Sequence, residues 1–391
     1  MPELHRLDPE SFCAFLRERG IRRAFLAPPR PGEPPRASHE ALAPLAAWLA
    51  SERRDHREHE AVFFQVGPET GALQGAFVHR TCRGQAAGGV RLRRYDTIES
   101  WFRDGLRLSY GMTLKNALAG LWWGGGKGVI DPAGAIDPEQ PGPRRRLYEE
   151  YGAFISSLRG CYVTAEDSGT TAEDMAAVFS RTRFTTCIPP EFGGSGNPSG
   201  PTARGVVCGM RAALDHLGMG GLRGKSVAVQ GLGEVGGRLV THLLEAGVAR
   251  VVGADPDARR IEALRRRHPD APLELRQVPA GDESILAEPV DILSPCAVGG
   301  VLNSRTIPSV RARVVCGAAN NQLEDPEADD ERLAGRGIVY VPDFLVNRMG
   351  IVNCADEQYG SVPDDPRVMS HLDDASPHGI YRTARDVLDR A

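Results

Sequence analysis

The sequence predicts an α/β protein with two domains: an N-terminal α/β substrate domain and a Rossmann-type, doubly wound dinucleotide-binding domain, separated by a cleft. A chain of 391 residues is long enough to bury two hydrophobic cores. After residue 225, short apolar runs alternate with helical patterns, which is typical of a parallel doubly wound sheet. A glycine-rich motif directly follows the first of these runs. The predicted segments are an N-terminal extension (1–56), a substrate and catalytic domain (57–200), an NAD-binding Rossmann domain (201–345) and a C-terminal segment returning towards the substrate domain (346–391).

The composition is that of an ordinary globular protein and argues against several classes of function. The formal net charge is -4, so no overall basic field attracts nucleic acid or an acidic membrane, and we expect neither as a partner. The start of the chain lacks the apolar stretch of a signal peptide, and no run approaches the ~18 apolar residues of a membrane span. The eight cysteines form no C-x-x-C pair and no Cys/His cluster. We therefore expect a cytoplasmic protein without a metal site.

The N-terminal half begins with an extension and continues with mixed strand and helix patterns. An amphipathic segment (9–19) precedes a proline-rich stretch (27–36), which can sustain neither a helix nor a strand ladder. Ser38 is placed to cap a helix that runs through 41–50. Beyond the extension, the periodicity predicts strands at 61–65 and 76–79, helices at 97–110 and 144–158, and a glycine-rich turn joined to an apolar strand within 121–130.

The C-terminal half shows a more regular alternation. The pattern predicts a linking helix at 202–216, strands at 226–230, 250–254, 290–293, 312–316 and 338–341, and helices at 238–246 and 258–267. Such alternation indicates strands that run parallel with helices on both faces of the sheet.

The motif after the strand at 226–230 is the dinucleotide fingerprint G-x-G-x-x-G. Its first glycine permits a tight turn, its second lets a pyrophosphate approach the backbone, and its third lets helix and strand pack closely. The helix N-terminus then offers free N–H groups to the phosphates. The predicted cofactor-binding residues of this turn are Gly231, Leu232, Gly233, Glu234, Val235 and Gly236.

Asp255 ends the next predicted strand, where a carboxylate can bind both ribose hydroxyls of NAD and repel the 2′-phosphate of NADP. The alternative is that Asp255 only caps the helix beginning near Pro256. Arg259 and Arg260 follow within one turn and are able to tolerate NADP. We predict NAD as the cofactor, with NADP the less favoured choice.

Only three lysines occur in the chain, and two of them lie in apolar or glycine-rich surroundings. These are Lys115 in GMTLKNA and Lys127 in GGGKG, and Asp167 follows in TAEDSGT. Oxidation of an amino acid requires a cation for the α-carboxylate, a base for the amine, and activation of water that attacks the iminium. A partly desolvated lysine beside another cation has a lowered pKa and can serve as a base. The alternative is that each lysine only extends from a strand end to solvent.

Seven motifs carry a family resemblance that extends from about residue 61 to 360. They are GGVRL, GMTLKNALAGLWWGGGKGVI, TAEDSGTT, SGNPSGPTARGV, VAVQGLGEVGG, CGAANNQL, and VPDFLVN with GIVNCADEQYG. In this order they resemble the glutamate/leucine/phenylalanine/valine dehydrogenase family, and they look most like its leucine dehydrogenase branch. The resemblance implies NAD-dependent oxidative deamination of an L-amino acid in amino-acid metabolism, by an oxidoreductase that acts reversibly on the CH–NH2 group and is a homo-oligomer.

The resemblance also implies the roles of individual residues. Lys115 would hold the substrate carboxylate, Lys127 would activate the attacking water, and Asp167 would exchange a proton with the amino group. The other implied contacts are Gly88 and Gly89 with the substrate, Thr202 with the nicotinamide amide, Asn320 and Asn321 lining the cofactor and substrate site, and Asn347 at the start of the last site loop.

The positions that match the family's specificity pocket are Ala87, Ala165, Ile351 and Cys354, none of which is charged. The glutamate branch has a lysine where Ala87 stands, so an apolar amino acid is favoured here, because a buried carboxylate without a partner is costly. The leucine branch has a larger aliphatic residue at that position. Ala87 therefore leaves branched-chain and aromatic substrates about equally favoured, unless a neighbouring side chain compensates for it.

Three features depart from the family pattern. The family has small residues where this chain has Arg348 and Met349, which could alter the cleft, add a cation for an unusual substrate or reduce activity. The segment after Gly360 is shorter than in leucine dehydrogenases, which leaves the oligomeric state open. Trp122 and Trp123 replace smaller residues and either belong to the core or contact substrate. The changed loop at Arg348 and the short segment after Gly360 keep open the alternative of a non-catalytic NAD-binding regulator. The enlarged pocket and the N-terminal extension keep open a biosynthetic variant that acts on an aromatic amino acid with a partner enzyme.

Overall fold

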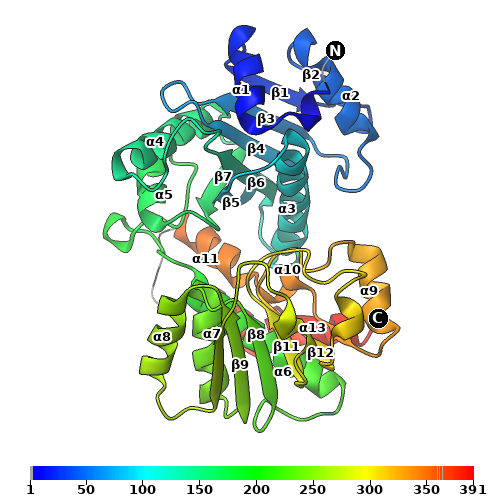
Figure 1. The fold of residues 1–391 in the computed structure, drawn as a ribbon. Coiled ribbons are helices and arrows are strands. Elements are labelled where there is room, and N and C mark those ends of the chain that lie inside the picture. The colour runs from blue at the N-terminus through cyan, green and yellow to red at the C-terminus, as the bar shows by residue number, and fades with distance from the viewer. Residues whose placement is uncertain (1–2, 359, 361, 363) are drawn as a thin grey trace. The chain divides into compact units, whose positions relative to one another are not determined.

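The computed structural model describes residues 3–358, 360, 362 and 364–391. The chain forms two compact units. The first comprises Met1–Asn197 with Cys354–Ser361, and the second comprises Pro198–Asn353 with Val362–Ala391. Residues 1–56, which the sequence analysis sets apart as an extension, belong to the first unit, and the C-terminal segment is divided between both. The two-domain α/β fold class is confirmed, because each unit is built on its own sheet (Figure 1).

The first unit contains a seven-stranded sheet in the order β2-β1-β3-β4-β6-β5-β7. Strands β5, β6 and β7 are parallel to one another, whereas the remaining pairs are antiparallel. The strands are β1 (Arg23–Ala27), β2 (Arg36–Ala37), β3 (Ala61–Val66), β4 (Leu73–Arg80), β5 (Ala86–Leu92), β6 (Gly124–Asp131) and β7 (Tyr162–Glu166). The helices are α1 (Pro9–Glu18), α2 (Ala43–Ser51), α3 (Ile98–Leu118), α4 (Pro141–Ser157) and α5 (Ala172–Phe179).

The glycine-rich run 124–126 is not the turn that the sequence analysis expects. It is the first part of β6, a fully buried strand between β4 and β5. Helix α3 packs so closely on this strand that a Cβ at Gly125 would lie 2.0 Å from Thr113 Oγ1 and 2.4 Å from the Ser109 carbonyl oxygen. Glycine occurs here because the helix backbone leaves no room for a side chain.

Residues 1–56 share a hydrophobic core with the rest of the first unit. Phe12 and Leu45 of this segment belong to the same buried cluster as Phe64 and Trp101. The predicted cap is wrong: α2 begins at Ala43, and the Ser38 hydroxyl instead accepts a hydrogen bond from the Phe25 N–H at 3.0 Å. The segment is therefore packed against the sheet as part of this unit.

The two adjacent tryptophans have different environments. Trp123 is fully buried, whereas Trp122 is 37% exposed. Trp123 is thus a core residue, as one of the two sequence interpretations holds, and Trp122 is at the surface of the first unit.

The second unit contains a six-stranded, wholly parallel sheet in the order β10-β9-β8-β11-β12-β13. Its strands are β8 (Ser226–Gln230), β9 (Arg250–Asp255), β10 (Leu273–Gln277), β11 (Ile292–Pro295), β12 (Val314–Val315) and β13 (Val339–Tyr340). Its helices are α6 (Ser199–His216), α7 (Glu234–Glu245), α8 (Ala258–Arg267), α9 (Pro326–Ala334), α10 (Asp343–Val346), α12 (Pro366–Met369) and α13 (Ile380–Leu388), while α11 (Met349–Glu357) begins in this unit and ends in the first. Strand β10 is not among the predicted strands, because only Leu275 of its five residues is buried and the segment has no apolar run.

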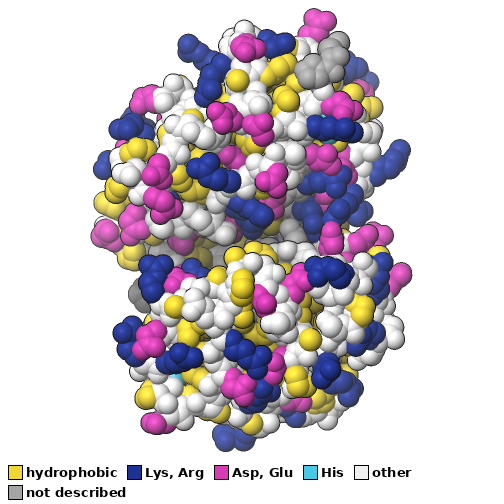
Figure 2. All heavy atoms as spheres, in the orientation of Figure 1, with side chains coloured by type: hydrophobic (Ala, Val, Ile, Leu, Met, Phe, Trp, Pro, Cys, Tyr) yellow, Lys and Arg dark blue, Asp and Glu magenta, His cyan; other side chains and the backbone are white. Residues whose placement is uncertain are grey.

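The outer surface of each unit carries both signs of charge. Figure 2 shows acidic and basic side chains interspersed on the visible face of both units. Within the described part of the chain, no helix has the length and apolarity needed to span a membrane.

The close packing of α3 on β6 predicts a large effect for a single added methyl group. We expect Gly125→Ala to destabilise the protein by about 3 kcal/mol, because neither the Ser109 backbone nor the helix can move away cheaply. Gly142→Ala is the control, because nothing lies within 4 Å of its Cβ position in α4, and alanine there should raise stability by up to about 1 kcal/mol. Thermal unfolding checks both, and an unchanged midpoint for Gly125→Ala would contradict this account of the strand.

Candidate active site

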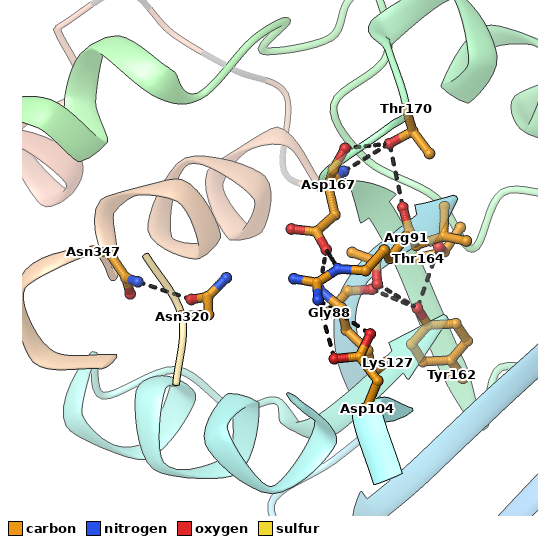
Figure 3. Close-up of polar contacts among 12 residues, drawn as sticks. Gly88, Arg91, Asp104, Lys127, Tyr162, Thr164, Asp167, Thr170, Asn320 and Asn347 are labelled. Atoms are coloured by element: carbon orange, nitrogen blue, oxygen red, sulfur yellow. Dashed lines mark hydrogen bonds and ion pairs between the residues drawn. The ribbon is translucent and has the colours of Figure 1, made fainter. Parts of the chain in front are cut away.

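Lys127 and Asp167 form a buried ion pair in the first unit. Lys127 Nζ lies 2.6 Å from Asp167 Oδ2, and the lysine side chain is only 3% exposed (Figure 3). Lys127 lies in β6, and Asp167 comes directly after β7. The structure therefore brings together two of the residues that the sequence analysis names for proton transfer.

Strand register explains why these residues converge. Arg91 of β5 pairs with Val129 of β6, and Val90 pairs with Glu166 of β7. Because side chains alternate along strands, Arg91, Lys127 and Asp167 all extend from the same face of the sheet. The Thr170 hydroxyl fixes the turn after β7, since it accepts the Asp167 N–H and donates to the Asp167 carbonyl, both at 2.8 Å.

Arg91 is a site residue that the sequence analysis did not name. Its Nε lies 3.4 Å from Asp167 Oδ2, and its Nη1 donates to both carboxylate oxygens of Asp104 at 3.1 Å (Figure 3). Tyr95 completes this network by donating its hydroxyl to Asp104 Oδ2 at 2.6 Å. The available sequence signal was the arginine in GGVRL, but Asp104 resembles an ordinary surface residue of a helix.

The charges in this cluster shift the acidity of both members of the pair. Burial lowers the pKa of Lys127 below its usual value, and the nearby Arg91 lowers it further, against the opposing effect of Asp167. Burial alone would raise the pKa of Asp167, but Lys127 and Arg91 outweigh it and hold this pKa well below the usual range. The carboxylate is therefore ionised, and the ammonium group loses its proton more readily than an ordinary lysine.

Two glycines of β5 allow other groups to come close to this pair. A Cβ on Gly89 would lie 2.7 Å from Asp167 Cβ, and one on Gly88 would lie 2.0 Å from the Gly126 carbonyl oxygen. The Gly88 carbonyl also accepts a hydrogen bond of 2.5 Å from the Tyr162 hydroxyl. Glycine at both positions is thus required by the distance between neighbouring backbones.

Lys115 lies in the last turn of α3 and is 8% exposed. Its neighbours on the helix face β5. Met112 Cγ lies 2.9 Å from the Cβ position of Gly88, and the Asn116 amide donates to the Ala87 and Gly124 carbonyls. These contacts place the Lys115 end of α3 beside Ala87 and Gly88, the segment predicted to bind substrate.

The residues predicted to form the specificity pocket are all buried. Ala87, Ala165 and Cys354 belong to the first unit, and Ile351 belongs to the second. Cys354 Sγ lies 3.1 Å from Cys187 Sγ, and both cysteines are free thiols. None of these four side chains carries a carboxylate or ammonium group that would pair with a charged substrate side chain.

In the second unit, the glycine turn has the close packing that the fingerprint predicts. A Cβ on Gly236 would lie 1.9 Å from the Gly231 carbonyl oxygen, so helix α7 and strand β8 meet at backbone distance. Gly231 also has a φ of +86°, which L side chains rarely adopt. At Gly233, by contrast, only the Arg260 guanidinium lies within 4 Å, at 3.4 Å, so the backbone there is accessible to a ligand.

Asp255 is buried next to this turn, at 2% exposure. Its Oδ2 accepts the Leu232 N–H at 2.7 Å and lies 3.4 Å from Arg260 Nη1, while its Oδ1 accepts the Asp257 N–H at 2.8 Å. The N-cap of α8 is Asp257, whose side chain accepts the Arg259 N–H. Asp255 therefore does not cap α8 and instead holds the glycine turn, contrary to the alternative interpretation.

Three asparagines and a threonine of the second unit form the other group of predicted residues. Asn347 Nδ2 donates to Asn320 Oδ1 at 2.8 Å and to the Ala318 carbonyl at 3.0 Å (Figure 3). Asn321 has a φ of +53°, and its N–H donates to Asp343 Oδ2. The Thr202 hydroxyl donates to the Pro198 carbonyl in the first turn of α6. Among the described residues, nothing donates a hydrogen bond to Asn347 Oδ1 or to Gln230 Oε1, although both atoms are buried.

The sequence leaves open whether Arg348 adds a cation for an unusual substrate, and in the structure its guanidinium is not exposed to a ligand. It is fully buried, and its Nη2 donates to the His378 carbonyl and, at 3.4 Å, to the Thr383 hydroxyl. The described part of the chain contains no group of three or more His, Cys, Asp or Glu residues arranged to hold a metal ion.

The fold and the site together define a class of protein. One unit has the strand, glycine turn and helix of a dinucleotide-binding fold, and the other buries a lysine–carboxylate pair suited to proton transfer. A dehydrogenase requires these two functions together.

Comparison with known proteins gives the family. Residues 63–184 match the model described as Glu/Leu/Phe/Val dehydrogenase, dimerisation domain, and residues 193–362 match Glutamate/Leucine/Phenylalanine/Valine dehydrogenase. The chain belongs to the glutamate/leucine/phenylalanine/valine dehydrogenase family, and the resemblance inferred from the sequence motifs is confirmed.

Individual relatives cover most of the chain. It is 41% identical to the leucine dehydrogenase of Geobacillus stearothermophilus over 307 residues, which are 78% of this chain and 79% of that protein. It is 44% identical to the valine dehydrogenase of Streptomyces albus, again over 307 residues, with 78% and 81% covered. The crystal structure of the L-tryptophan dehydrogenase from Nostoc punctiforme is similar with a TM-score of 0.63 and 34% identity, covering 85% of this chain and 89% of that one.

The charge cluster around Lys127 makes a prediction that does not depend on activity. Because the chain has only three lysines, ¹³C-labelled lysine should give few enough NMR signals to follow Lys127 through a pH titration. We expect Arg91→Met to raise the pKa of Lys127, since a neighbouring cation is removed, and Asp167→Asn to lower it, since the attracting carboxylate is removed.

Arg145→Met is the matched control for this titration, because Arg145 is a surface arginine with a 74% exposed side chain in α4. It should leave the Lys127 titration unchanged. A Lys127 signal that titrates at the same pH in wild type and in Arg91→Met would show that the cluster does not set its acidity.

Proposed function

We propose that this protein catalyses the reversible, NAD-dependent oxidative deamination of an apolar L-amino acid, branched-chain or aromatic. The products are the 2-oxo acid, ammonium, NADH and a proton, and one water molecule is consumed. The observation that carries the proposal is the buried contact between Lys127 and Asp167 beside the glycine pair Gly88–Gly89. This is the arrangement that proton transfer at a small, tightly held substrate requires.

Each polar group in the first unit has a chemical task in this proposal. Lys115 binds the substrate α-carboxylate as a compact cation. Asp167 is ionised and accepts a proton from the substrate amino group, so that the nitrogen lone pair becomes available. Lys127, with its lowered pKa, takes a proton from the water that attacks the iminium carbon. Arg91 keeps both groups in the required ionisation states by its position beside Asp167.

The second unit has residues that fit NAD. The Gly233 backbone is accessible, and the α7 N-terminus would offer N–H groups to the pyrophosphate. Asp255, which is hydrogen-bonded to the glycine turn, would bind the ribose hydroxyls. The free acceptor atoms of Asn347 and Gln230 are further groups that a ligand would satisfy. When bound, NAD supplies the acceptor for the hydride that leaves the substrate α-carbon. Thr202 and Asn320 would hold its nicotinamide end.

An apolar substrate follows from the side chains at the family's specificity positions. Ala87, Ala165, Ile351 and Cys354 are uncharged, and burying a substrate carboxylate against them would be unfavourable. The named relatives act on leucine, valine and tryptophan, which extends from branched-chain to aromatic side chains. The small side chain of Ala87 makes room for the larger of these side chains but leaves both classes about equally favoured, and a substrate screen decides between them.

The two alternative functions gain no support. Retention of Lys115, Lys127 and Asp167, with the last two in contact, argues against a non-catalytic regulator. No relative named above is described as acting with a partner enzyme. The description of residues 63–184 as a dimerisation domain supports a homo-oligomer, and light scattering of the purified protein would measure its size. The cytoplasmic location stays a prediction from the sequence.

Substitution of Lys127 tests the mechanism directly. We expect Lys127→Ala to lower kcat at least ~100-fold, as for the loss of a general base, while the affinity for NADH changes little. Steady-state assays at the NADH absorbance with all twenty amino acids, together with NADH fluorescence titration, measure both quantities and identify the substrate.

Lys225→Ala is the control, because Lys225 directly precedes β8, at the end of the strand away from the glycine turn, and should retain full activity. Deamination by Lys127→Ala at the wild-type rate would overturn the assigned role. Absence of NADH formation by the wild type with every amino acid, despite tight NADH binding, would instead support the regulatory alternative.

Substitution of Asp255 tests the choice of cofactor. We expect Asp255→Ala to weaken NADH binding about tenfold and to strengthen NADPH binding by a similar factor. The reason is that the repelling carboxylate is lost and Arg260, 3.4 Å away, becomes available to a 2′-phosphate. Asp8→Ala, which removes the N-cap of α1 in the first unit, is the control and should not change the preference. Fluorescence titration with both nucleotides checks this, and an unchanged ratio would contradict the role of Asp255.

A further inference from the structure

Arg348 is the largest fully buried polar side chain among the described residues of the second unit. Burying a guanidinium is costly unless its N–H groups are hydrogen-bonded, so an arginine in this position must be matched by acceptors. Burial lowers the pKa of Arg348 to about 10, and the group still carries its charge at neutral pH. The surroundings of this side chain therefore indicate what it does.

Two hydrogen bonds connect Arg348 to the start of helix α13. Its Nη2 donates to the carbonyl of His378, which directly precedes the N-cap Gly379, and to the Thr383 hydroxyl. Thr383 in turn donates to the Gly379 carbonyl at 2.8 Å. The guanidinium is thus attached to the first turn of α13.

Helix α13 and the segment around Arg348 pack on the same part of helix α6. A Cβ on Gly205 of α6 would lie 2.5 Å from the Val346 carbonyl oxygen, 2.8 Å from Ile380 Cδ1 and 3.2 Å from Met349 Cγ. Gly205 is therefore the point at which α6, α13 and the residues on either side of Arg348 meet. This packing leaves the segment 346–349 little freedom once Arg348 is hydrogen-bonded to α13.

The residue before Arg348 is Asn347, which holds Asn320 through the 2.8 Å amide contact. A continuous set of contacts therefore runs from α13 through Arg348 to Asn347 and on to Asn320. We propose that Arg348 is a positioning residue: it attaches the Asn347 loop to α13 and thereby fixes the side-chain amides of Asn347 and Asn320. This inference rests on the proposed function, in which both asparagines contact cofactor or substrate.

The test compares Arg348→Met, which keeps the size of the side chain but removes its hydrogen bonds, with Arg348→Lys, which keeps one charged donor. We expect Arg348→Met to lower kcat/KM at least ~10-fold and to weaken NADH binding, at a temperature where circular dichroism shows a folded protein. Arg348→Lys should recover part of both losses. Hydrogen exchange of the peptide that contains Asn347 should be faster in Arg348→Met than in wild type.

Arg382→Met is the matched control, because Arg382 is an exposed residue in the same turn of α13, and we expect wild-type kinetics from it. Thr383→Val removes the 3.4 Å hydrogen bond from Arg348, together with the hydrogen bond from Thr383 to the Gly379 carbonyl, and keeps the contact between Arg348 and the His378 carbonyl. It therefore provides a graded test if Arg348→Met does not fold, with a smaller loss of the same sign expected. Wild-type kcat/KM, NADH affinity and hydrogen exchange in Arg348→Met, or in Thr383→Val if the former is unfolded, would overturn the proposal. An inactive wild type would instead count against the proposed function.

Discussion

The contact between Lys127 and Asp167 is the interaction on which the candidate active site of the first unit depends. Two charges removed from water must be close together and further hydrogen-bonded, or they would destabilise the fold. Three adjacent parallel strands supply this arrangement, because β5, β6 and the residue directly after β7 each contribute one member of the cluster from the same face of the sheet. Arg91 then compensates both Asp167 and Asp104, so that the buried groups balance one another.

The glycines near this cluster follow from the same constraint. Short contacts between charged groups require the strands, the turn after β7 and helix α3 to approach one another at backbone distance. Any side chain at Gly88, Gly89 or Gly125 would collide with atoms that cannot move independently. In the glycine-rich stretch, the fold therefore requires the absence of a side chain and does not require the conformational freedom of glycine.

The sequence predicts those parts of the molecule that local residues determine, and it misses those that depend on distant neighbours. The strand at 226–230 and the helix at 258–267 were predicted to the residue, because apolar periodicity and glycine position report local structure directly. Strand β6 was mistaken in part for a turn, since glycine has low strand propensity and its reason for being there lies in α3, a non-local neighbour. Arg91 and Asp104 were missed for a similar reason: only the register of the sheet brings them to Asp167.

Lys127 and Arg348 are both buried cations, and their different surroundings suit them to different roles. Lys127 has a carboxylate partner, a lowered pKa and glycine backbone beside it, and an amine can release its proton at an accessible pH. Arg348 is bound to a carbonyl and a hydroxyl, and a guanidinium keeps its proton throughout the working range of an enzyme. Burial of a cation therefore has a different consequence in each unit. Under the proposed function, burial in the first unit prepares Lys127 for proton transfer, and in the second unit the proposed role of the buried Arg348 is to fix the loop that begins with Asn347.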